Sequence, residues 1–361
     1  MNKKLDYQLF FTIIIIVFIG LALIYSASNI WALSKFHDPL YYVKHQLLFA
    51  IIGFIIMIII ISIPTKYITN HLNDLLFFSI ILLSIVLIPG IGQIRNGSRS
   101  WFGIGSFGIQ PSEFAKLSLI LFISKYAAKN RHDMQNTKKG LLPILSIIFL
   151  IILLIMLEPD FGSAFVILLS SLSIILISET KISIFLKLGI LGLILGSILI
   201  IIAPYRIARI TSFLNPWQDP LGNGFQIIQS LYAIGPNGLL GSGYLNSIQK
   251  NFYLPEPQTD FIFSIASEEF GFLGILIIIT LFLIIFYRSL KVSLSANNLT
   301  NKYIAFGLSS SILLQALLNL SVVIGLVPVT GVTLPFISYG GSSLLTSLIA
   351  MGIILNISKN K

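Results

Sequence analysis

The sequence predicts an all-α integral membrane protein with ten transmembrane helices. Hydrophobic residues make up 56% of its 361 residues, and the mean hydropathy is +0.94. The apolar residues also form repeated runs close to the length of about 20 residues that crosses a hydrocarbon core, which excludes a soluble protein. These runs are continuous and lack the period-two alternation of an outer-membrane barrel, so helices are expected.

Each predicted span is an apolar run whose edges fall at proline, glycine or a charged residue. In order, the spans are 10–28 after the charged N-terminus, 46–63 before Pro64, 75–92 after Asp74, 112–128 after Pro111, 141–157 after Gly140, 162–178 before Glu179, 184–204 ending at Pro204, 261–287 before Arg288, 303–328 after Lys302 and 334–357 before Lys359.

Positive charge sets the predicted orientation. If both termini are cytoplasmic, most of the 23 lysines and arginines lie at cytoplasmic helix ends, as the positive-inside rule requires. The chain is then one polytopic membrane domain, 1–361, with a large extracytoplasmic loop at 205–260 and smaller outer loops at 29–45, 93–111 and 158–161. A basic inner face that attracts anionic lipid explains the net charge of +10 without nucleic acid. We interpret the first span, which ends in "YSAS", as an uncleaved anchor.

Metal and thiol chemistry find little support in the sequence. It has no cysteine, and its four histidines show no ligand spacing. Candidate functional residues gather instead in the predicted outer loops. Arg95 and Arg99 lie in loop 93–111 against the orientation rule, so recognition of a phosphate or carboxylate is one explanation, and contact with lipid headgroups is the alternative.

Two pairs of charged residues lie in or beside these loops. Glu113 and Lys116 are three residues apart at a helix start marked by proline, and we expect them to form an ion pair. Glu158 and Asp160 occupy a very short outer turn between two spans. Turn geometry alone explains Asp160 better than it explains Glu158.

The long loop 205–260 combines basic and amphipathic stretches. Arg206 and Arg209 share a face if their segment is helical. The stretch "GFQIIQSLYAI" has a short amphipathic pattern and is expected to lie along the membrane surface. Such a surface suits a lipid-linked substrate with a polar head, while a structural lid without ligand contacts is the alternative.

Carboxylates crowd against the start of span 261–287. Asp260 stands where the helix dipole favours negative charge, and Thr259 is another candidate cap. Glu268 and Glu269 lie deeper by about 12–14 Å, given a rise of about 1.5 Å per residue. Carboxylates at membrane depth face a cavity or a partner, so capping explains Asp260 alone.

The last predicted span is interrupted near its start. Pro335 and the pair Gly340 and Gly341 break an otherwise continuous apolar run. Membrane helices tolerate such breaks where their backbone faces a cavity or a neighbour, although a packing seam of small residues gives the same pattern.

Seven stretches together carry a resemblance to a known family. They are "DYQLFF" with "YSAS", "VKHQL", "RNGSRSWFGIGSFGIQPSEFAKL", "EPDFGSA", "FQIIQSLYAIGPNGLLGSG", "QKNFYLPEPQTDFIFSIASEEFGFLG" and "LPFISYGGSSLL". In this order they resemble the SEDS family (shape, elongation, division and sporulation), membrane glycosyltransferases that polymerise peptidoglycan. The last motif resembles the division and sporulation branches (FtsW, SpoVE) more than the elongation branch (RodA), although Thr330 stands where many division-type members carry lysine.

The resemblance implies a reaction on lipid II outside the cytoplasmic membrane, with Asp260 at the position of the family's essential carboxylate. A carboxylate base suits a sugar hydroxyl nucleophile, and positive charge suits the departing pyrophosphate. No obligatory cofactor is evident, and a divalent cation, Mg²⁺ or Mn²⁺, is left open. The expected partners are lipid II, the growing glycan strand, a class B penicillin-binding transpeptidase and other divisome or elongasome membrane proteins.

The remaining candidate residues divide into two expected roles. Glu113, Glu268, Glu269, Pro335, Gly340 and Gly341 are expected to shape the structure or a cavity. Residues expected to bind substrate are Arg95, Arg99, Lys116, Glu158, Arg206, Arg209, Gln249, Lys250, Ser338 and Tyr339. Two other functions stay open at this point, a lipid II flippase and a scaffold that recruits a transpeptidase.

Overall fold

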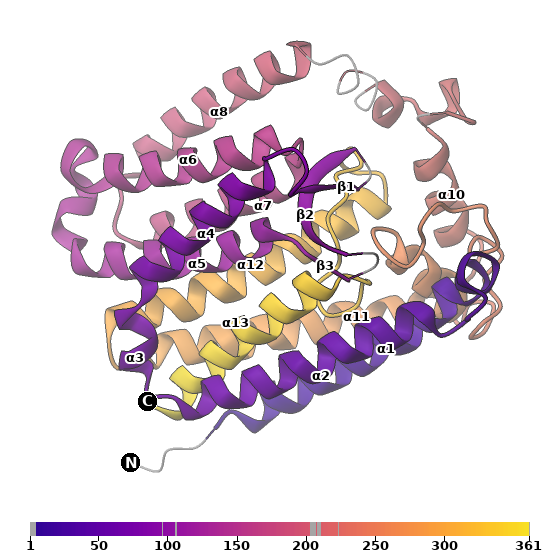
Figure 1. Cartoon of the computed structure of the whole chain (residues 1–361), viewed down its shortest axis with the longest axis horizontal. Helices are drawn as coiled ribbons and strands as arrows, with labels where there is room; N and C mark the ends of the chain where they lie inside the picture. The colour runs from indigo at the N-terminus through magenta and orange to yellow at the C-terminus, as the bar shows by residue number, and fades with distance from the viewer. Residues whose placement is uncertain are drawn as a thin grey trace.

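The structure is a computed structural model that describes residues 5–95, 97–104, 107–202, 207, 211–222 and 224–360. Most of the described chain is helical, and the long helices run side by side (Figure 1). The beginning of the first helix and the end of the last one lie at the same end of the molecule, where the backbone N–H of Asp6 donates to Ser358 Oγ over 3.2 Å.

Each of the ten predicted segments contains a helix in the described part of the chain. They are α1 (Tyr7–Phe36), α2 (Tyr41–Ser62), α4 (Leu72–Val86), α5 (Pro111–Lys129), α6 (Leu142–Leu157), α7 (Phe161–Ile177), α8 (Ile182–Ile202), α11 (Ile262–Leu294), α12 (Leu299–Val323) and α13 (Gly341–Lys359).

Six helical stretches within the described residues are long and apolar enough to cross a membrane. They are Tyr7–Phe36, Tyr41–Ser62, Thr137–Leu157, Ile262–Leu294, Leu299–Val323 and Gly341–Lys359. Many of their large apolar side chains point outward, as for Ile55 and Ile58 of α2. An exterior of this kind suits lipid, so the chain is a multi-pass membrane protein.

Several helix boundaries differ from the predicted ones. The first helix begins earlier because Asp6 caps it by accepting from the backbone N–H of Leu9 over 3.0 Å. Helix α12 ends at Val323 rather than 328, and α13 begins at Gly341 rather than 334. The segment 325–340 between them is not helical. Its backbone enters the left-handed region at Phe336, where φ is 66°, and helical geometry does not include that region.

Short elements complete the helical part. They are α3 (Thr65–Asn70), η1 (Arg131–Gln135), η2 (Thr137–Leu141), η3 (Pro216–Gln218) and α10 (Phe225–Ile234). Helix α10 coincides with the amphipathic stretch noted in the sequence, while its place along the membrane surface stays a prediction. Its buried residues include Ile227 and Ile228, and it packs against α11 and α12.

Loop 93–111, which the sequence treated as a plain connection, contains a small antiparallel sheet. Strands β1 (Gln93–Arg95), β2 (Ser98–Ile104) and β3 (Phe107–Ile109) lie in that order. Arg95 pairs with Ser98, so β1 and β2 are neighbouring strands of an antiparallel hairpin. The sheet lies over the ends of α4 and α5.

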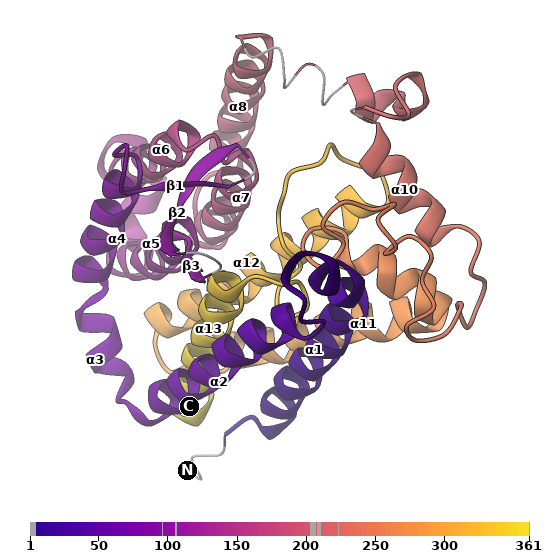
Figure 2. The same ribbon diagram turned by 45° about the vertical axis from the view of Figure 1, so that its right-hand side comes forward.

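Helix α12 lies at the centre of the bundle. It packs against α5, α7, α11 and α13, and α13 in turn packs along α2. Helix α8 stands apart from the others in both views (Figures 1 and 2). The end of α12 that carries Val323, the start of α11 and the start of α13 therefore meet in one region.

Helix α11 is broken at Gly271, and residues 239–243 pack against the break. Gly271 has φ 59° and ψ −156°, and a Cβ there would lie 2.4 Å from the backbone nitrogen of Gly241. The N–H groups of Ser242 and Gly243 donate to the carbonyls of Glu268 and Glu269, both over 2.9 Å. Glycine at 271 is therefore required for this close approach.

Candidate active site

Asp260 lies in a turn just before α11 and is half-buried. The N-cap of α11 is Phe261, and no side chain caps the helix. The Thr259 hydroxyl donates instead to the carbonyl of Glu256 over 2.9 Å. The capping explanation for Asp260 and Thr259 is therefore wrong, and the position of the Asp260 carboxylate needs another reason.

The non-helical segment 325–340 surrounds Asp260. The side-chain amide of Asn319, in α12, donates to the carbonyls of both Asp260 and Val332, each over 2.8 Å. A Cβ at Gly331 would lie 3.8 Å from Asp260 Oδ2, so a side chain at position 331 would contact the carboxylate. Thr330 precedes this glycine. Its hydroxyl oxygen is buried, and no described residue forms a hydrogen bond with it.

Two further connections fix the loop beside the turn that carries Asp260. The Ser338 hydroxyl donates to Thr259 O over 2.6 Å, and the Tyr339 N–H donates to Gln258 O over 2.8 Å. Gln46, in α2, holds the other side of the loop, because its amide donates to Ser338 O over 3.2 Å and accepts from Gly340 N over 3.1 Å. Both partners of the Ser338 hydroxyl are backbone groups, since it also accepts from a loop N–H.

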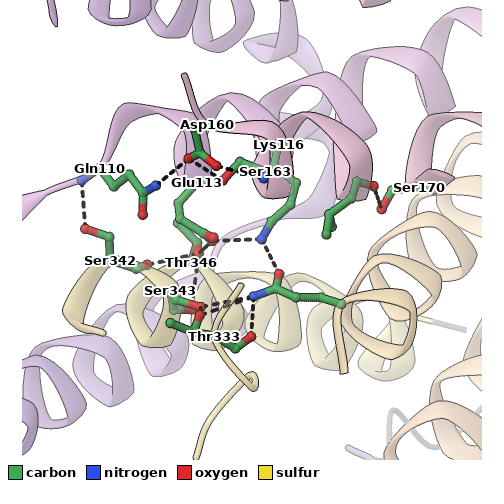
Figure 3. A network of polar contacts seen from close by, with 12 residues as sticks. Gln110, Glu113, Lys116, Asp160, Ser163, Ser170, Thr333, Ser342, Ser343 and Thr346 are labelled. Carbon is green, nitrogen blue, oxygen red and sulfur yellow. Dashed lines mark hydrogen bonds and ion pairs between the residues drawn. The ribbon is translucent and has the colours of Figure 1, made fainter. Parts of the chain in front are cut away.

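A buried polar network extends from this loop into the bundle (Figure 3). Lys116 and Glu113 form the predicted ion pair, with Nζ 2.8 Å from Oε2. Lys116 also donates to Gln315 Oε1, and Glu113 accepts from the Thr346 hydroxyl over 2.9 Å. Gln315 donates to Thr333 O over 3.1 Å, which connects the ion pair to segment 325–340.

Asp160 extends the network toward the sheet. It caps α7 by accepting from the N–H of Ser163 over 3.0 Å, and Gln110 donates to its other oxygen over 3.0 Å (Figure 3). Gln110 N also donates to the hydroxyl of Ser342, near the start of α13, over 2.9 Å. Burial raises the pKa of Asp160, while the hydrogen bonds from Ser163 and Gln110 act against that rise.

Glu158 is enclosed in the same turn. Its side chain is fully buried, and no described residue forms a hydrogen bond to either carboxylate oxygen. Burial, with a smaller effect of the neighbouring Asp160 charge, raises the pKa of Glu158 to about 9. The carboxyl is therefore protonated at neutral pH, and its expected contact with substrate stays a prediction.

The two arginines of the small sheet are held in different ways. Arg95 lies over the ring of Trp101, 5.0 Å from its centroid, and donates to Gln93 over 3.1 Å. Burial of Tyr339 raises the pKa of its hydroxyl to about 12, and the positive charge of Arg95 acts against this rise. Arg95 therefore lies within electrostatic range of segment 325–340, which contains Tyr339. Arg99 donates to Leu87 O over 3.4 Å, and its buried Nε has no described partner. Arg206 and Arg209 lie outside the described residues.

Glu268 and Glu269 of α11 bind residues 247–250, which precede the helix in the sequence. Glu269 and Lys250 form a buried ion pair of 2.8 Å, and both groups contact the hydroxyl of Ser26 in α1. Glu268 accepts from the N–H of Ile248 over 2.8 Å and from the hydroxyl of Ser247. This geometry supports the expected structural role of both glutamates. Substrate contact by Lys250 stays a prediction and would require the ion pair to open.

Gln249 takes part in the same junction through its backbone. Its N–H donates to Glu268, while its side-chain Oε1 is buried and has no described partner. Substrate binding by Gln249 therefore stays a prediction. Pro335 is buried within segment 325–340, and Gly341 starts α13 against the ring of Phe49. The predicted interruption of the last span is thus a loop that precedes the helix.

Sequence reasoning missed several residues that organise the site. They are single polar residues inside apolar helices: Ser26, Gln46, Gln315, Asn319 and Thr346. The cost of a polar side chain at membrane depth was the available signal, and it would have marked all five for a buried partner. The identity of those partners depends on packing that the sequence does not show.

The described residues contain no group of three or more His, Cys, Asp and Glu side chains that could hold a metal ion. Asp260 is the half-buried carboxylate beside segment 325–340. Magnesium is often bound by one or two carboxylates together with substrate phosphates, so a divalent cation here would depend on the oxygens of a bound pyrophosphate.

Comparisons with known proteins agree along the whole chain. A sequence model of the family described as "Cell cycle protein", covering FtsW, RodA and SpoVE, matches residues 7–361. Stage V sporulation protein E of Bacillus subtilis is 48% identical over 360 residues, which cover 99% of this chain and 98% of that protein. The probable peptidoglycan glycosyltransferase FtsW of Trichlorobacter lovleyi is 38% identical over 353 residues, covering 98% and 93%.

Solved structures share the fold. A chain from a peptidoglycan synthase complex that coordinates polymerization and crosslinking superposes with a TM-score of 0.81 at 29% identity, over 99% of this chain and 98% of that one. The rod shape determining protein RodA of Thermus thermophilus gives a TM-score of 0.73 at 24% identity, covering 99% and 97%. The latter likeness concerns the fold alone.

Proposed function

Because this chain belongs to the FtsW/RodA/SpoVE family of cell cycle proteins, we propose that it is a peptidoglycan glycosyltransferase that polymerises lipid II for septal or elongation wall synthesis. The observation that carries the proposal is the position of Asp260, a half-buried carboxylate at the start of α11 that segment 325–340 faces. Relatives named as peptidoglycan glycosyltransferases align with almost the entire chain, which supports the same activity.

Asp260 acts as the general base in the proposed reaction. It removes the proton from the 4-hydroxyl of the acceptor GlcNAc, and that oxygen attacks the anomeric carbon of MurNAc at the end of the growing strand. The bond to the lipid pyrophosphate breaks, and its electron pair leaves with the pyrophosphate. A positioned base contributes about 10²–10⁴-fold to such a step. No general acid is needed because pyrophosphate is already a good leaving group.

Positive charge near the leaving group comes from the outer arginines in this proposal. Arg95 and Arg99 lie on the sheet that connects to α13 through Gln110 and Ser342. The buried Nε of Arg99 has no hydrogen-bond partner among the described residues. A planar guanidinium can bind a phosphate in two places, which suits a pyrophosphate. Lys116 donates to Gln315, and Gln315 donates to the carbonyl of Thr333 in segment 325–340.

The proposed topology has ten transmembrane helices, both termini cytoplasmic and loop 205–260 outside the bacterial cytoplasmic membrane. The distribution of lysine and arginine supports it. Single cysteines at Asn136 and Asn246 in this cysteine-free chain test it with an impermeant thiol reagent on intact spheroplasts. Labelling of Asn246→Cys alone is expected, whereas labelling of Asn136→Cys would contradict the ten-helix arrangement.

A class B penicillin-binding transpeptidase is the proposed partner. The similarity to a chain of a solved peptidoglycan synthase complex supports this assignment, because that complex joins polymerization to crosslinking. Other divisome or elongasome membrane proteins are further proposed partners. Co-purification from the native membrane, followed by identification of the bound proteins, tests the assignment directly.

The activity test uses purified protein with labelled lipid II. Asp260→Asn removes the base with little change in size, so polymerisation is expected to fall by about 10²-fold or more while lipid II still binds. Glu256→Gln, on the exposed rim of the same turn, is the matched control and should polymerise normally. Normal polymerisation by Asp260→Asn would overturn the assignment of the base.

The same assay separates the competing functions. Wild-type protein that moves lipid II across a bilayer without forming polymer is a flippase. Protein that does neither, alone or with its transpeptidase, is a scaffold. Polymer formed by the wild type and lost in Asp260→Asn supports the glycosyltransferase.

A further inference from the structure

A polar cavity of about 350 Å³ lies at the opposite end of α12 from the candidate active site. Asn301 and Asn319 are separated on this helix by about 27 Å, at a rise of about 1.5 Å per residue. The cavity is therefore distinct from the region of Asp260. The residues that line it come from α3, α5 and the start of α12: Thr65, Lys66, Thr69, Asn70, Lys125, Asn298, Thr300 and Asn301.

The lining is positively charged and rich in hydrogen-bond donors. Two of the described lining residues, Lys66 and Lys125, are basic, and none is acidic. The N-terminus of α12 also lies at this cavity, since Asn298, Thr300 and Asn301 line it, and a helix N-terminus attracts anions. Lys125 donates to Thr69 O over 2.7 Å, which fixes its ammonium group at the cavity wall.

Asn301 gives an independent indication of a ligand. Its residue is 6% exposed and lines the cavity, yet no described residue forms a hydrogen bond with its side-chain amide. Its backbone N–H is already taken by the side chain of Asn298, over 2.7 Å. Buried amides normally have partners, so this one is available to a bound group. Lys66 likewise has no ion-pair partner among the described residues.

We propose that this cavity binds a phosphate ester. Lys66, Lys125 and the start of α12 contact the phosphate oxygens, while Asn301 contacts a neighbouring hydroxyl or ester oxygen. The cavity lies where α2 ends at Ser62 and α12 begins at Leu299, which is the level at which spans leave the hydrocarbon. An anionic phospholipid headgroup at the inner surface is the source that this depth favours, and a soluble phosphate compound has the same chemistry.

The test uses the full chain purified in neutral detergent and titrated with dihexanoyl phosphatidylglycerol. Saturable binding is measured by the shift in thermal unfolding midpoint and by native mass spectrometry. Lys66→Gln is expected to weaken binding about 5-fold, since one lysine near an anionic surface contributes about that factor. Lys66 is exposed and has no structural partner to lose, so this variant should fold normally. Lys129→Gln, an exposed lysine at the end of α5 outside the cavity, is the matched control.

Two further probes identify the source of the phosphate. Dihexanoyl phosphatidylcholine, which carries no net charge, should bind at least several-fold more weakly than the glycerol lipid. Glycerol 1-phosphate that binds alone and is weakened by Lys66→Gln would support the site with a soluble ligand. The proposal is overturned if the Lys66→Gln and Asn301→Ala proteins bind dihexanoyl phosphatidylglycerol and glycerol 1-phosphate as the wild type does. It is also overturned if Lys129→Gln weakens binding as much as Lys66→Gln does.

Discussion

Two lysine–glutamate pairs with little exposed surface occur among the described residues, and their surroundings differ. Lys250 and Glu269 are 2% and 0% exposed at the side chain, and they join the outer loop to α11. Lys116 and Glu113 are 12% and 9% exposed, on one helix, beside a small cavity of about 20 Å³. The first pair closes a junction, whereas the second leaves space next to its ammonium group.

The partners of each pair show why the difference matters. Glu269 is bound by the ammonium group of Lys250 and by Ser26, and its neighbour Glu268 holds the backbone of the same loop. Lys116 reaches Gln315, which contacts the segment that faces Asp260. Breaking an ion pair in a closed junction leaves an uncompensated buried charge. The second pair connects instead to segment 325–340, so we expect a change in it to alter the surroundings of Asp260.

The largest expected effect comes from breaking the closed pair. Glu269→Gln leaves Lys250 charged and unpaired in a buried site, so the free energy of unfolding should fall by about 3–5 kcal/mol. Unfolding in detergent by increasing sodium dodecyl sulfate measures the loss. The double variant Lys250→Met with Glu269→Leu should recover most of it, because apolar residues can replace both charges. An equally stable Glu269→Gln protein would show that this pair does not hold the loop.

A smaller stability effect and a larger activity effect are expected for the open pair. Lys116→Met should lower the free energy of unfolding by about 1.5–3 kcal/mol, since Glu113 keeps the Thr346 hydroxyl as a partner. Polymerisation per folded molecule should fall at least tenfold, because Gln315 loses its support below the loop. Lipid II polymerisation by the folded fraction is the measurement. Unchanged polymerisation would make this pair structural, like the first.

The pH dependence of Glu158 sharpens the comparison further. Its folded pKa of about 9 exceeds its ordinary value of 4.5, so the folded state holds the proton more tightly. The resulting stability is full below about pH 4.5 and is lost as pH rises toward about 9, by at most about 1.4 kcal/mol per pH unit. Glu158→Gln should flatten this decline when thermal midpoints are recorded from pH 5 to 9. A parallel decline in both proteins would contradict the raised pKa.

The smallest effect is expected at an exposed pair. Lys44 and Asp38 lie 2.7 Å apart near the start of α2, and the lysine side chain is 62% exposed. Water and salt screen such a pair, so Lys44→Gln should leave the thermal midpoint and the polymerisation rate unchanged within error. A clear loss of stability would show that the start of α2 is less hydrated than the exposure of Lys44 indicates.

The sequence alone was sufficient for the helical membrane class of the fold, and it singled out Asp260 as the candidate acid, whose role stays a prediction. Apolar runs fixed the approximate places of the helices, since a segment that must cross lipid has to satisfy its backbone internally. The ion pair of Glu113 with Lys116 followed from helical spacing, and the amphipathic helix α10 followed from its own pattern. The prominence of Asp260 followed from the cost of charge near a membrane and from the family resemblance.

Tertiary structure decided which polar groups meet. The break of α11 at Gly271 and the loop before α13 arise because segments distant in the sequence supply their hydrogen-bond partners, whereas the strands of the sheet at 93–109 pair with one another. Asn319 joins Asp260 to Val332 although these residues lie 59 and 13 positions from it. Local patterns give the cost of a buried polar side chain but not its partner, because the partner is set by how the helices pack.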